Sequence, residues 1–309
     1  MNLAEQLDVL HVGAGIVGRA DRGHVLVAGP DARSFLQALV SADLDALASG
    51  QGAESLLLTP QGKLDVAFRV LVVDDDVWLD CDPGFGARLA ASLNRFRIRV
   101  KADVIDRTGE EAMVSLIGPE VVSRFAVVPH AMHEHVAWAD ARVVRTAHGV
   151  DVLGPALAVE RARSELSGHG WPMVEPVAYE AWRIEQGIPA QPFDVDDATI
   201  PQEAELERDA VSFTKGCFLG QELVCRIDSR GHVNRFLRRL TAIDGDWPPR
   251  GAEMVVDGRV VGALTSVAAP EVPTGALGYV RREVDVPAEV ELRWPGGSAH
   301  ARVEALRPS

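Results

Sequence analysis

Cysteine is scarce in this chain of 309 residues, with only Cys81, Cys217 and Cys225 present. A small, odd number of cysteines argues against a secreted disulfide framework and favours a reducing compartment, so we expect a cytoplasmic protein. Seven residues separate Cys217 from Cys225, which is wider than the spacing of paired zinc or iron–sulfur ligands. The sequence therefore predicts no bound metal.

Long apolar runs and an excess of basic residues are also missing. No uncharged stretch approaches the roughly 18 apolar residues of a membrane span. The first residues include Glu5 and Asp8 and lack the apolar core of a signal peptide. The 31 basic against 45 acidic residues give a net charge of −14, which repels the phosphate backbone of nucleic acids. We therefore expect neither a membrane nor a nucleic acid as a direct partner.

The composition that remains is that of a globular protein, with 47% hydrophobic residues, and the length suggests about two domains. Three times, a predicted strand ends at a Gly-Pro pair and an amphipathic helix follows; the strands are expected at His24–Ala28, Met113–Ile117 and Val150–Leu153. Glycine permits the sharp turn, and proline suits the first turn of a helix. This pattern predicts α+β subdomains of the split βαβ kind rather than a helical bundle.

Other segments add strands to these units and a β-rich end. Between the first two units, the pattern predicts strands over 54–59, 64–73, 77–81 and 97–105 and a helix over 84–96. From residue 236 onward, short apolar strands alternate with Gly, Pro and Asp turns. Many short strands in about 70 residues predict a small separate β-barrel or sandwich.

A glycine-rich segment near the start, Gly13–Gly18, spells G-x-G-x-x-G. A dinucleotide fingerprint needs a helix directly after it, because the helix N-terminus holds the pyrophosphate. Here a charged turn, Arg19–Gly23, follows and the next element is a predicted strand. We therefore interpret the segment as a glycine-rich lead-in and not as a nucleotide site.

The stretch Phe213–Glu222, with the sequence FTKGCFLGQE, is the part of the chain that points to chemistry. Gly216 and Gly220 bracket Cys217, and glycines permit a tight turn or the close approach of a ligand. Lys215 places positive charge near the thiol, which lowers the pKa of a cysteine and raises its thiolate fraction. The alternative is a loop with a buried, inert cysteine.

A helix is expected over 219–228, directly after this cysteine. Gln221 and Glu222 fall in its first turn, where negative charge is favourable. Arg226 follows Glu222 by four residues and faces the same side, so the two can form an ion pair.

This stretch resembles the signature of the YgfZ family, Lys-Gly-Cys-Tyr/Phe-x-Gly-Gln-Glu, at every fixed position. Other segments that resemble the family are Arg183–Pro189, Ile200–Ala204 and Arg230–Val233, with Gly29–Gln37 and Gln61–Lys63 in its first half. The resemblance covers about residues 20 to 240. The β-rich end matches the C-terminal barrel of the family.

YgfZ proteins are folate-binding relatives of the glycine-cleavage T-protein GcvT, an aminomethyltransferase. The resemblance implies an α+β fold, in which two interleaved ferredoxin-like subdomains and a small C-terminal β-barrel form a ring around a cavity. We place the domains at 1–110, 111–235 and 236–309. The resemblance also implies tetrahydrofolate or a derivative as cofactor. It implies a role in the assembly or repair of iron–sulfur enzymes, including those that modify tRNA, with these enzymes or assembly proteins as partners.

The same resemblance assigns roles to residues of the signature. Lys215 and Cys217 are the functional pair, and Gly216 and Gly220 approach the folate. Gln221 and Glu222 complete this part of the predicted site.

Upstream, Glu185 aligns with the T-protein glutamate that binds the pterin, since a carboxylate can accept paired N–H bonds from it. A surface i,i+4 ion pair is the alternative for Glu185. Arg226 either meets the glutamate tail of the folate or pairs with Glu222. Tyr179 and Trp182 either stack on a ring of the folate or belong to the core.

One departure bears on activity. The T-protein carries its catalytic aspartate in an Asp-Asp pair, whereas this chain has a single carboxylate, Asp65, in the region Lys63–Val66. The T-protein lacks the Lys-Gly-Cys signature that is present here. The alternative function is therefore a folate-dependent aminomethyl- or methyl-transferase with Asp65 as its acid or base.

A group of three histidines, His130, His133 and His135, has no accompanying carboxylate or cysteine motif. We interpret it as a solvated loop.

Free tRNA is expected to bind only weakly and without sequence selectivity, because the net charge is −14 and no basic stretch with interleaved aromatics is present. Filter binding at physiological salt measures this. A submicromolar, sequence-selective complex would contradict the accessory role and favour direct handling of tRNA.

Overall fold

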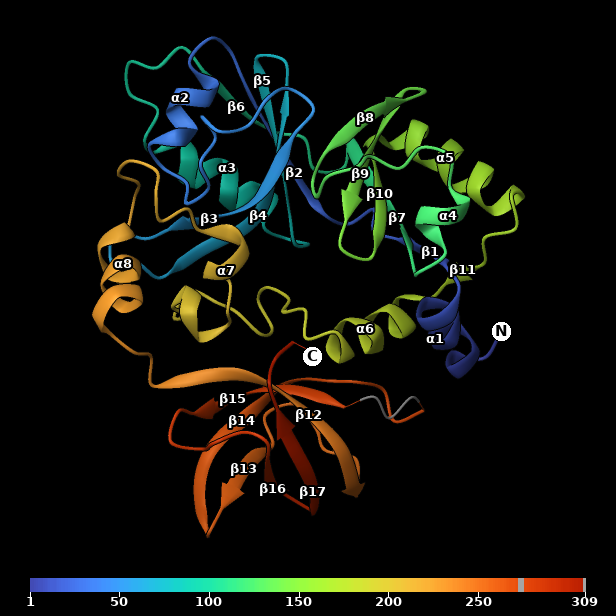
Figure 1. Cartoon of the computed structure of the whole chain (residues 1–309), viewed down its shortest axis with the longest axis vertical. Coiled ribbons are helices and arrows are strands. Elements are labelled where there is room, and N and C mark those ends of the chain that lie inside the picture. Colours follow the sequence, from blue (N-terminus) through green and yellow to red (C-terminus); the bar gives the residue numbers. More distant parts are fainter. Residues whose placement is uncertain (272–274, 308–309) are drawn as a thin grey trace. The chain divides into compact units, whose positions relative to one another are not determined.

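The computed structural model describes residues 1–271 and 275–307. The chain divides into two compact units, each built from separate segments (Figure 1). The sheet unit comprises Asp8–Glu175 and Arg208–Glu222, and the barrel unit comprises Met1–Leu7, Pro176–Glu207 and Leu223–Ser309. The division into three domains at 1–110, 111–235 and 236–309 stays a prediction.

The first sheet of the sheet unit is antiparallel, in the order β3-β4-β5-β2-β6. Its strands are β2 (Gly23–Ala28), β3 (Gly52–Leu58), β4 (Leu64–Val73), β5 (Asp76–Cys81) and β6 (Asp103–Asp106). The amphipathic helices α2 (Ala32–Gln37) and α3 (Gly86–Asn94) bury their apolar sides against one face. The strand predicted over 97–105 is confirmed only at its end, since irregular backbone occupies residues 97–102.

The second sheet has the order β11-β1-β7-β10-β9-β8 and is antiparallel except for the β1–β11 pair. Its strands are β1 (Gly15–Gly18), β7 (Glu111–Ile117), β8 (His135–Trp138), β9 (Ala141–Thr146), β10 (Gly149–Pro155) and β11 (Met173–Val174). Helices α4 (Val121–Arg124) and α5 (Ala156–Gly168) pack on one face. The glycine-rich segment is strand β1, which follows helix α1 (Leu3–Val12) and precedes β2 without a helix between them.

The three strand–helix junctions are confirmed, with one difference in detail. At the second junction, Gly118 has a φ of +138°, and a Cβ there would meet the carbonyl oxygen of Gly13 at 2.3 Å, so only glycine fits. Each helix begins one or two residues after its proline, and Pro155 is the N-cap residue of α5. The prolines therefore end the strands and do not form the first helical turns.

The predicted C-terminal barrel is confirmed as a closed antiparallel barrel in the order β12-β15-β14-β13-β16-β17. Its strands are β12 (Arg235–Gly245), β13 (Glu253–Val256), β14 (Arg259–Val267), β15 (Ala276–Arg281), β16 (Ala288–Trp294) and β17 (Gly297–Glu304). Alternate side chains fill its interior, including Leu240, Met254 and Leu292. Closure leaves the barrel without a free sheet edge.

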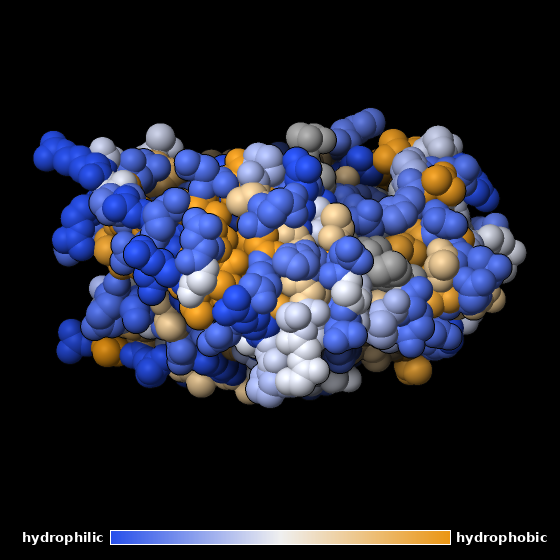
Figure 2. Space-filling model, turned by 90° about the horizontal axis from the view of Figure 1, so that it is seen from below, coloured by the Kyte–Doolittle hydropathy of each residue, from blue (hydrophilic) through white to orange (hydrophobic). Residues whose placement is uncertain are grey.

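The remaining helices lie between β11 and β12 along the chain. They are α6 (Pro176–Glu185), the 3-10 helix η1 (Pro201–Glu203), α7 (Glu207–Ala210) and α8 (Gln221–Arg230). Figure 2 shows mostly hydrophilic side chains on the face that it draws, with apolar groups between them. Across residues 1–271 and 275–307, the helices are too short or too polar to span a lipid bilayer.

The two sheets of the sheet unit pack against each other through the faces that the helices leave open. Leu71 and Trp78 from the first sheet meet Met113, Val144 and Leu153 from the second. These side chains form a small apolar layer between the sheets.

A buried ionic network lies beside this apolar layer. Arg69 Nε donates to Asp80 Oδ2 at 2.8 Å, and Arg69 Nη1 donates to Asp151 Oδ2 of the second sheet at 2.7 Å. Arg22 Nη2 donates to Asp80 Oδ1 at 2.8 Å, and the Ser115 hydroxyl donates to Asp151 Oδ1 at 2.6 Å. Burial alone would raise the pKa of Asp80, but the two guanidiniums hold it well below its usual range.

Three histidines lie at or near this interface; His24 and His135 are buried and His133 is half-buried. Burial lowers the pKa of His24, His133 and His135 to about 4 each. The expectation of a solvated loop is therefore wrong for His133 and His135, because β8 and the turn before it carry them inward. His133 Nε2 lies 3.8 Å from Glu54 Oε1.

These pKa values predict a loss of stability in mild acid. Between pH 6.5 and 4 the unfolded chain protonates each histidine while the folded chain does not, so the free energy of unfolding falls as the pH falls. Glu54 acts in the opposite sense, because its pKa is raised to about 7 by burial, but its side chain is 42% exposed and its effect is smaller. Replacing His24 with Gln should reduce the fall between pH 7 and pH 5 by about 2 kcal/mol.

Urea unfolding of wild type and His24→Gln at both pH values measures this difference. Equal pH dependence of the two proteins would show that His24 titrates normally in the folded state.

Candidate functional site

The signature loop, residues 211–220, connects α7 to α8 and is fastened to the sheet unit by its lysine. Lys215 Nζ donates to the carbonyl oxygens of Gln37, Val40 and Ala42 at 2.8, 2.7 and 2.7 Å. These carbonyls lie at and beyond the end of α2. Burial lowers the pKa of Lys215 to about 8, while the three carbonyl oxygens favour the charged form. The ammonium group thus anchors the loop.

Gly220 anchors the other end of the loop. Its φ is +77°, and a Cβ there would meet the carbonyl oxygen of Thr59 at 2.3 Å and Leu58 Cβ at 2.9 Å. The loop end therefore packs on the β3–β4 hairpin, and Asp65 lies on β4 just beyond this turn. Gly216 differs, because a Cβ on it would meet nothing within 4 Å.

Cys217 lies between these two anchors and is exposed. The other two cysteines are less accessible. Cys81 is fully buried and burial raises its pKa to about 12, while Cys225 is half-buried and burial raises its pKa as well. The alternative of a buried, inert cysteine does not describe Cys217.

The start of helix α8 follows the signature loop. Gln221 Oε1 accepts a hydrogen bond from the backbone N–H of Phe218 at 3.1 Å, so its side chain ties the first residue of the helix to the signature loop. Phe218 is buried, whereas Glu222 and Arg226 are exposed. Gln221 therefore has a structural partner, and Glu222 and Arg226 are available to solvent.

The residues predicted to bind the pterin lie on α6 in the barrel unit. Glu185 is the last residue of α6, is half-buried, and its carbonyl oxygen accepts a bond from Arg239 Nη1 at 3.0 Å. Tyr179 and Trp182 stack on each other with ring centroids 5.9 Å apart. Trp182 is buried and belongs to the core, whereas Tyr179 is half-buried.

In the segment Arg183–Pro189, Arg183 has a structural role. Arg183 is 3% exposed, and its guanidinium donates to Asp194 Oδ2 at 2.8 Å and to the Ser266 hydroxyl at 3.0 Å. It also pairs with Glu180. Arg183 thereby joins α6 to the loop that follows it and to the barrel strand β14.

Asp65 is 7% exposed at the start of β4. Arg88 Nε of helix α3 donates to Asp65 Oδ1 at 2.7 Å. The ion pair occupies one of the two carboxylate oxygens.

Several charged and polar residues inside apolar strands escaped the sequence analysis. Arg69 interrupts LDVAFRVLVV, and Asp80, Asp151 and His24 likewise stand in buried strands. A charge in a buried strand needs a partner. A charged residue within an apolar run is therefore the sequence signal for a buried ionic contact. Over the described ranges, no group of three or more His, Cys, Asp or Glu residues could hold a metal ion.

Known proteins resemble this chain in sequence and in fold. No family model matches the chain. A chloroplastic protein of Arabidopsis thaliana with a provisional transferase name is 26% identical over 299 residues, 90% of this chain and 68% of that protein. The tRNA-modifying protein YgfZ of Edwardsiella ictaluri is 29% identical over 226 residues, 68% of this chain and 66% of the relative.

A mitochondrial iron-sulfur cluster assembly factor IBA57 homolog of Neurospora crassa is 26% identical over 275 residues, 85% of this chain and 61% of the relative. The chain thus spans about two thirds of the length of these relatives. The crystal structure of the glycine cleavage system aminomethyltransferase T from Bartonella henselae matches with a TM-score of 0.85 at 20% identity, over 98% of this chain and 88% of that chain.

The chain is similar in sequence to YgfZ and IBA57 proteins, and its fold is that of the aminomethyltransferase GcvT. The resemblance and the α+β fold predicted from the sequence are therefore confirmed. Within this family fold, the Lys-Gly-Cys signature is a loop with two structural anchors and one exposed thiol.

Replacing Gly220 with Ala should destabilise the protein by roughly 1–3 kcal/mol, because the new Cβ meets backbone atoms and the φ is unfavourable. Gly216→Ala is the matched control and should leave stability unchanged, because its Cβ enters open space. Urea unfolding of both variants tests this. Similar losses in the two variants would contradict the described packing of the loop.

Iodoacetamide near neutral pH should alkylate Cys217 first, Cys225 more slowly and Cys81 only on unfolding, in the order of their exposure. Mass spectrometry of peptides over a time course measures the order. The prediction is contradicted if Cys225 reacts faster than Cys217 in the native protein.

Proposed function

We propose that this protein binds a reduced folate in the cytoplasm and supports the assembly or repair of iron–sulfur enzymes, with Cys217 as its reactive group. Through such client enzymes it supports tRNA modification without binding tRNA. The observation that carries the proposal is the exposed Cys217 between the anchors at Lys215 and Gly220. The names of two relatives, a tRNA-modifying protein and an iron–sulfur cluster assembly factor, support it.

In the signature loop, the residues that fix the backbone are different from the residue that can react. Lys215 and Gly220 fix the loop by contacts within the sheet unit, so the position of Cys217 on it is held while its thiol stays in solvent. A thiol in this setting can act as a nucleophile, a redox group or a transient ligand of a cluster delivered by a partner. Gly216 leaves open space beside the thiol, which allows a partner or ligand to approach closely.

The folate part of the proposal rests on the chemistry of α6 and the start of α8. The half-buried carboxylate of Glu185 can accept paired N–H bonds from a pterin, and Tyr179 offers an aromatic face. The exposed Arg226 can meet the carboxylates of the folate tail. A bound reduced folate would supply one-carbon or redox chemistry, and these residues would bind and orient it.

The transferase alternative requires Asp65 as acid or base. The ion pair with Arg88 argues against that role, because it occupies a carboxylate oxygen that a substrate would have to reach. A turnover assay with tetrahydrofolate and an aminomethyl or N-methyl donor decides between the two functions. Turnover that is lost in Asp65→Asn would replace the accessory role by the transferase.

Calorimetry with tetrahydrofolate should show binding that Glu185→Ala weakens about ten- to a hundredfold, as expected for a charge-assisted pair. Glu289→Ala, an exposed glutamate on the barrel strand β16, serves as the control and should bind as wild type does. Equal affinity of wild type and Glu185→Ala would remove Glu185 from the site.

Cys217→Ser should bind folate normally and melt at nearly the wild-type temperature, but should lower the activity of client iron–sulfur enzymes in cells. Full client activity in this variant would leave folate binding in place and exclude Cys217 as the reactive group.

A further inference from the structure

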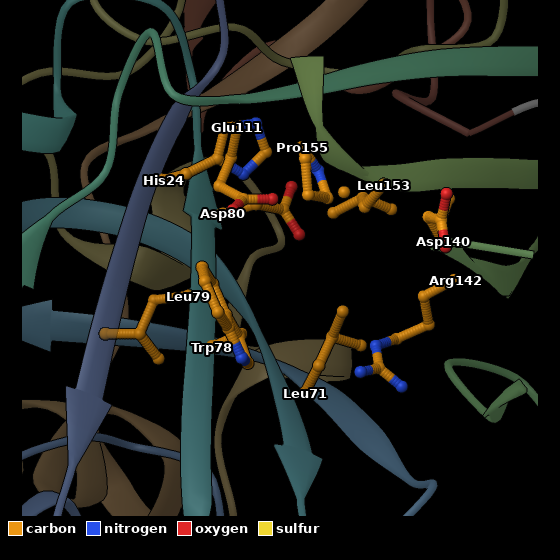
Figure 3. Close-up of a pocket in the computed structure, with 12 residues that line it drawn as sticks. His24, Leu71, Trp78, Leu79, Asp80, Glu111, Asp140, Arg142, Leu153 and Pro155 are labelled. Carbon is orange, nitrogen blue, oxygen red and sulfur yellow. The ribbon is translucent and has the colours of Figure 1, made fainter. Parts of the chain in front are cut away.

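The sheet unit contains a cavity whose lining residues are remote in sequence from the signature loop. It is a cleft of about 230 Å³ between the two sheets, at the end of their apolar layer. Leu71 and Trp78 form one wall, and Leu153 and Pro155 form part of the other. Figure 3 shows His24, Asp80 and Glu111 close together on one side of the cleft and Arg142 on the other.

His24 gives the first indication that the cleft receives a polar ligand. Its side chain lines the cleft and is 2% exposed, and its Nε2 atom is buried without a hydrogen-bond partner in the described chain. Burial lowers the pKa of this imidazole to about 4, so it is neutral near pH 7. An unpaired ring nitrogen in such a place costs stability unless something binds to it.

Glu111 and Arg142 give the second, independent indication. Both line the cleft and both are half-buried. Among residues 1–271 and 275–307, Arg142 has no acidic side chain and Glu111 no basic one within ion-pair distance. Burial raises the pKa of Glu111 and lowers that of Arg142, so each charge is held at a cost.

The two charges do not neutralise each other because a strand separates them. β10 runs between β7, which carries Glu111, and β9, which carries Arg142. Two strand spacings, about 10 Å, therefore lie between their main chains. The register places Arg142 opposite Leu153 and Glu111 opposite Pro155, so both side chains rise from the same face of the sheet.

The arrangement of charges selects the class of ligand. A simple anion would pair with Arg142 but would face the carboxylates of Glu111 and Asp80, and a simple cation would face Arg142. A small zwitterion satisfies both ends at once. The apolar and aromatic walls, Leu71, Trp78 and Leu153, require an apolar body between or beside its charges.

We propose that this cleft binds a free α-amino acid with an apolar or aromatic side chain. Its carboxylate pairs with Arg142, its ammonium group pairs with Glu111, and its side chain packs against Trp78 and Leu71. The His24 ring provides a further hydrogen bond to the polar end. This site is independent of the folate site and of Cys217.

Calorimetry with L-phenylalanine, L-leucine and L-methionine tests the proposal on the full-length protein. At least one of these amino acids should bind. Hydrocinnamate, which lacks the ammonium group, and phenethylamine, which lacks the carboxylate, should bind at least about tenfold more weakly than phenylalanine. Absence of heat with all three amino acids at millimolar concentration would overturn the proposal, as would equal binding of the two analogues.

Glu111→Gln and Arg142→Gln should each weaken amino-acid binding about ten- to a hundredfold. Their melting temperatures should fall little, because neither side chain has an ion-pair partner among the described residues and Arg142 loses only its contact with His135 Nδ1 at 3.3 Å. This combination separates a binding role from a structural one. Glu110→Gln, at an exposed neighbour that pairs with Arg107, is the matched control and should bind as wild type does. Wild-type affinity in both cleft variants would place any binding elsewhere and overturn the proposal.

Discussion

The guanidinium of Arg69 holds the two sheets of the sheet unit together. It is bound by Asp80 of its own sheet and Asp151 of the other, and all three side chains are buried. Removing any one of them would leave an uncompensated charge between the sheets, which is far more costly than losing a surface pair. The apolar layer beside this network and the cleft at its end depend on the spacing that the network fixes. The fold of the sheet unit is therefore specified by charge as much as by apolar packing.

Local patterns in the sequence predict most of the elements and little of what joins them. The alternation in Leu64–Val73 and the turns of the barrel predict strands that the structure confirms. Strands β8 and β9 were not predicted, because ARVVRT and HVAW are short and show no clean alternation. The partners of Arg69 and Lys215 lie up to 178 residues away along the chain, and no local pattern encodes such contacts. The charge inside an apolar run is the sequence signal that such a partner must exist.

The signature motif contains residues that stabilise the loop and residues that do not. A match to the sequence pattern alone cannot tell the two groups apart. Lys215 donates to three carbonyl oxygens, Gly220 packs against a backbone, and Gln221 binds the backbone N–H of Phe218 in the loop. Cys217 and Gly216 have no comparable task within the chain. The sequence placed charge from Lys215 beside the thiol, whereas the structure directs that charge to the end of α2. The contribution of the motif to folding is thus distinct from what its thiol does.

Each of the two units is built from separate segments of the chain, which affects how the protein folds during translation. The chain passes between them after Leu7, Glu175, Glu207 and Glu222. The sheet unit therefore lacks its last segment, including the lysine that fastens the loop, until residue 222 has left the ribosome. By then α6 and η1 have also left the ribosome, whereas the barrel strands that they contact are still untranslated. Until the barrel strands are synthesised, these helices are exposed and can form non-native contacts. Pauses in translation between residues 176 and 235 should therefore lower the yield of folded protein more than pauses elsewhere.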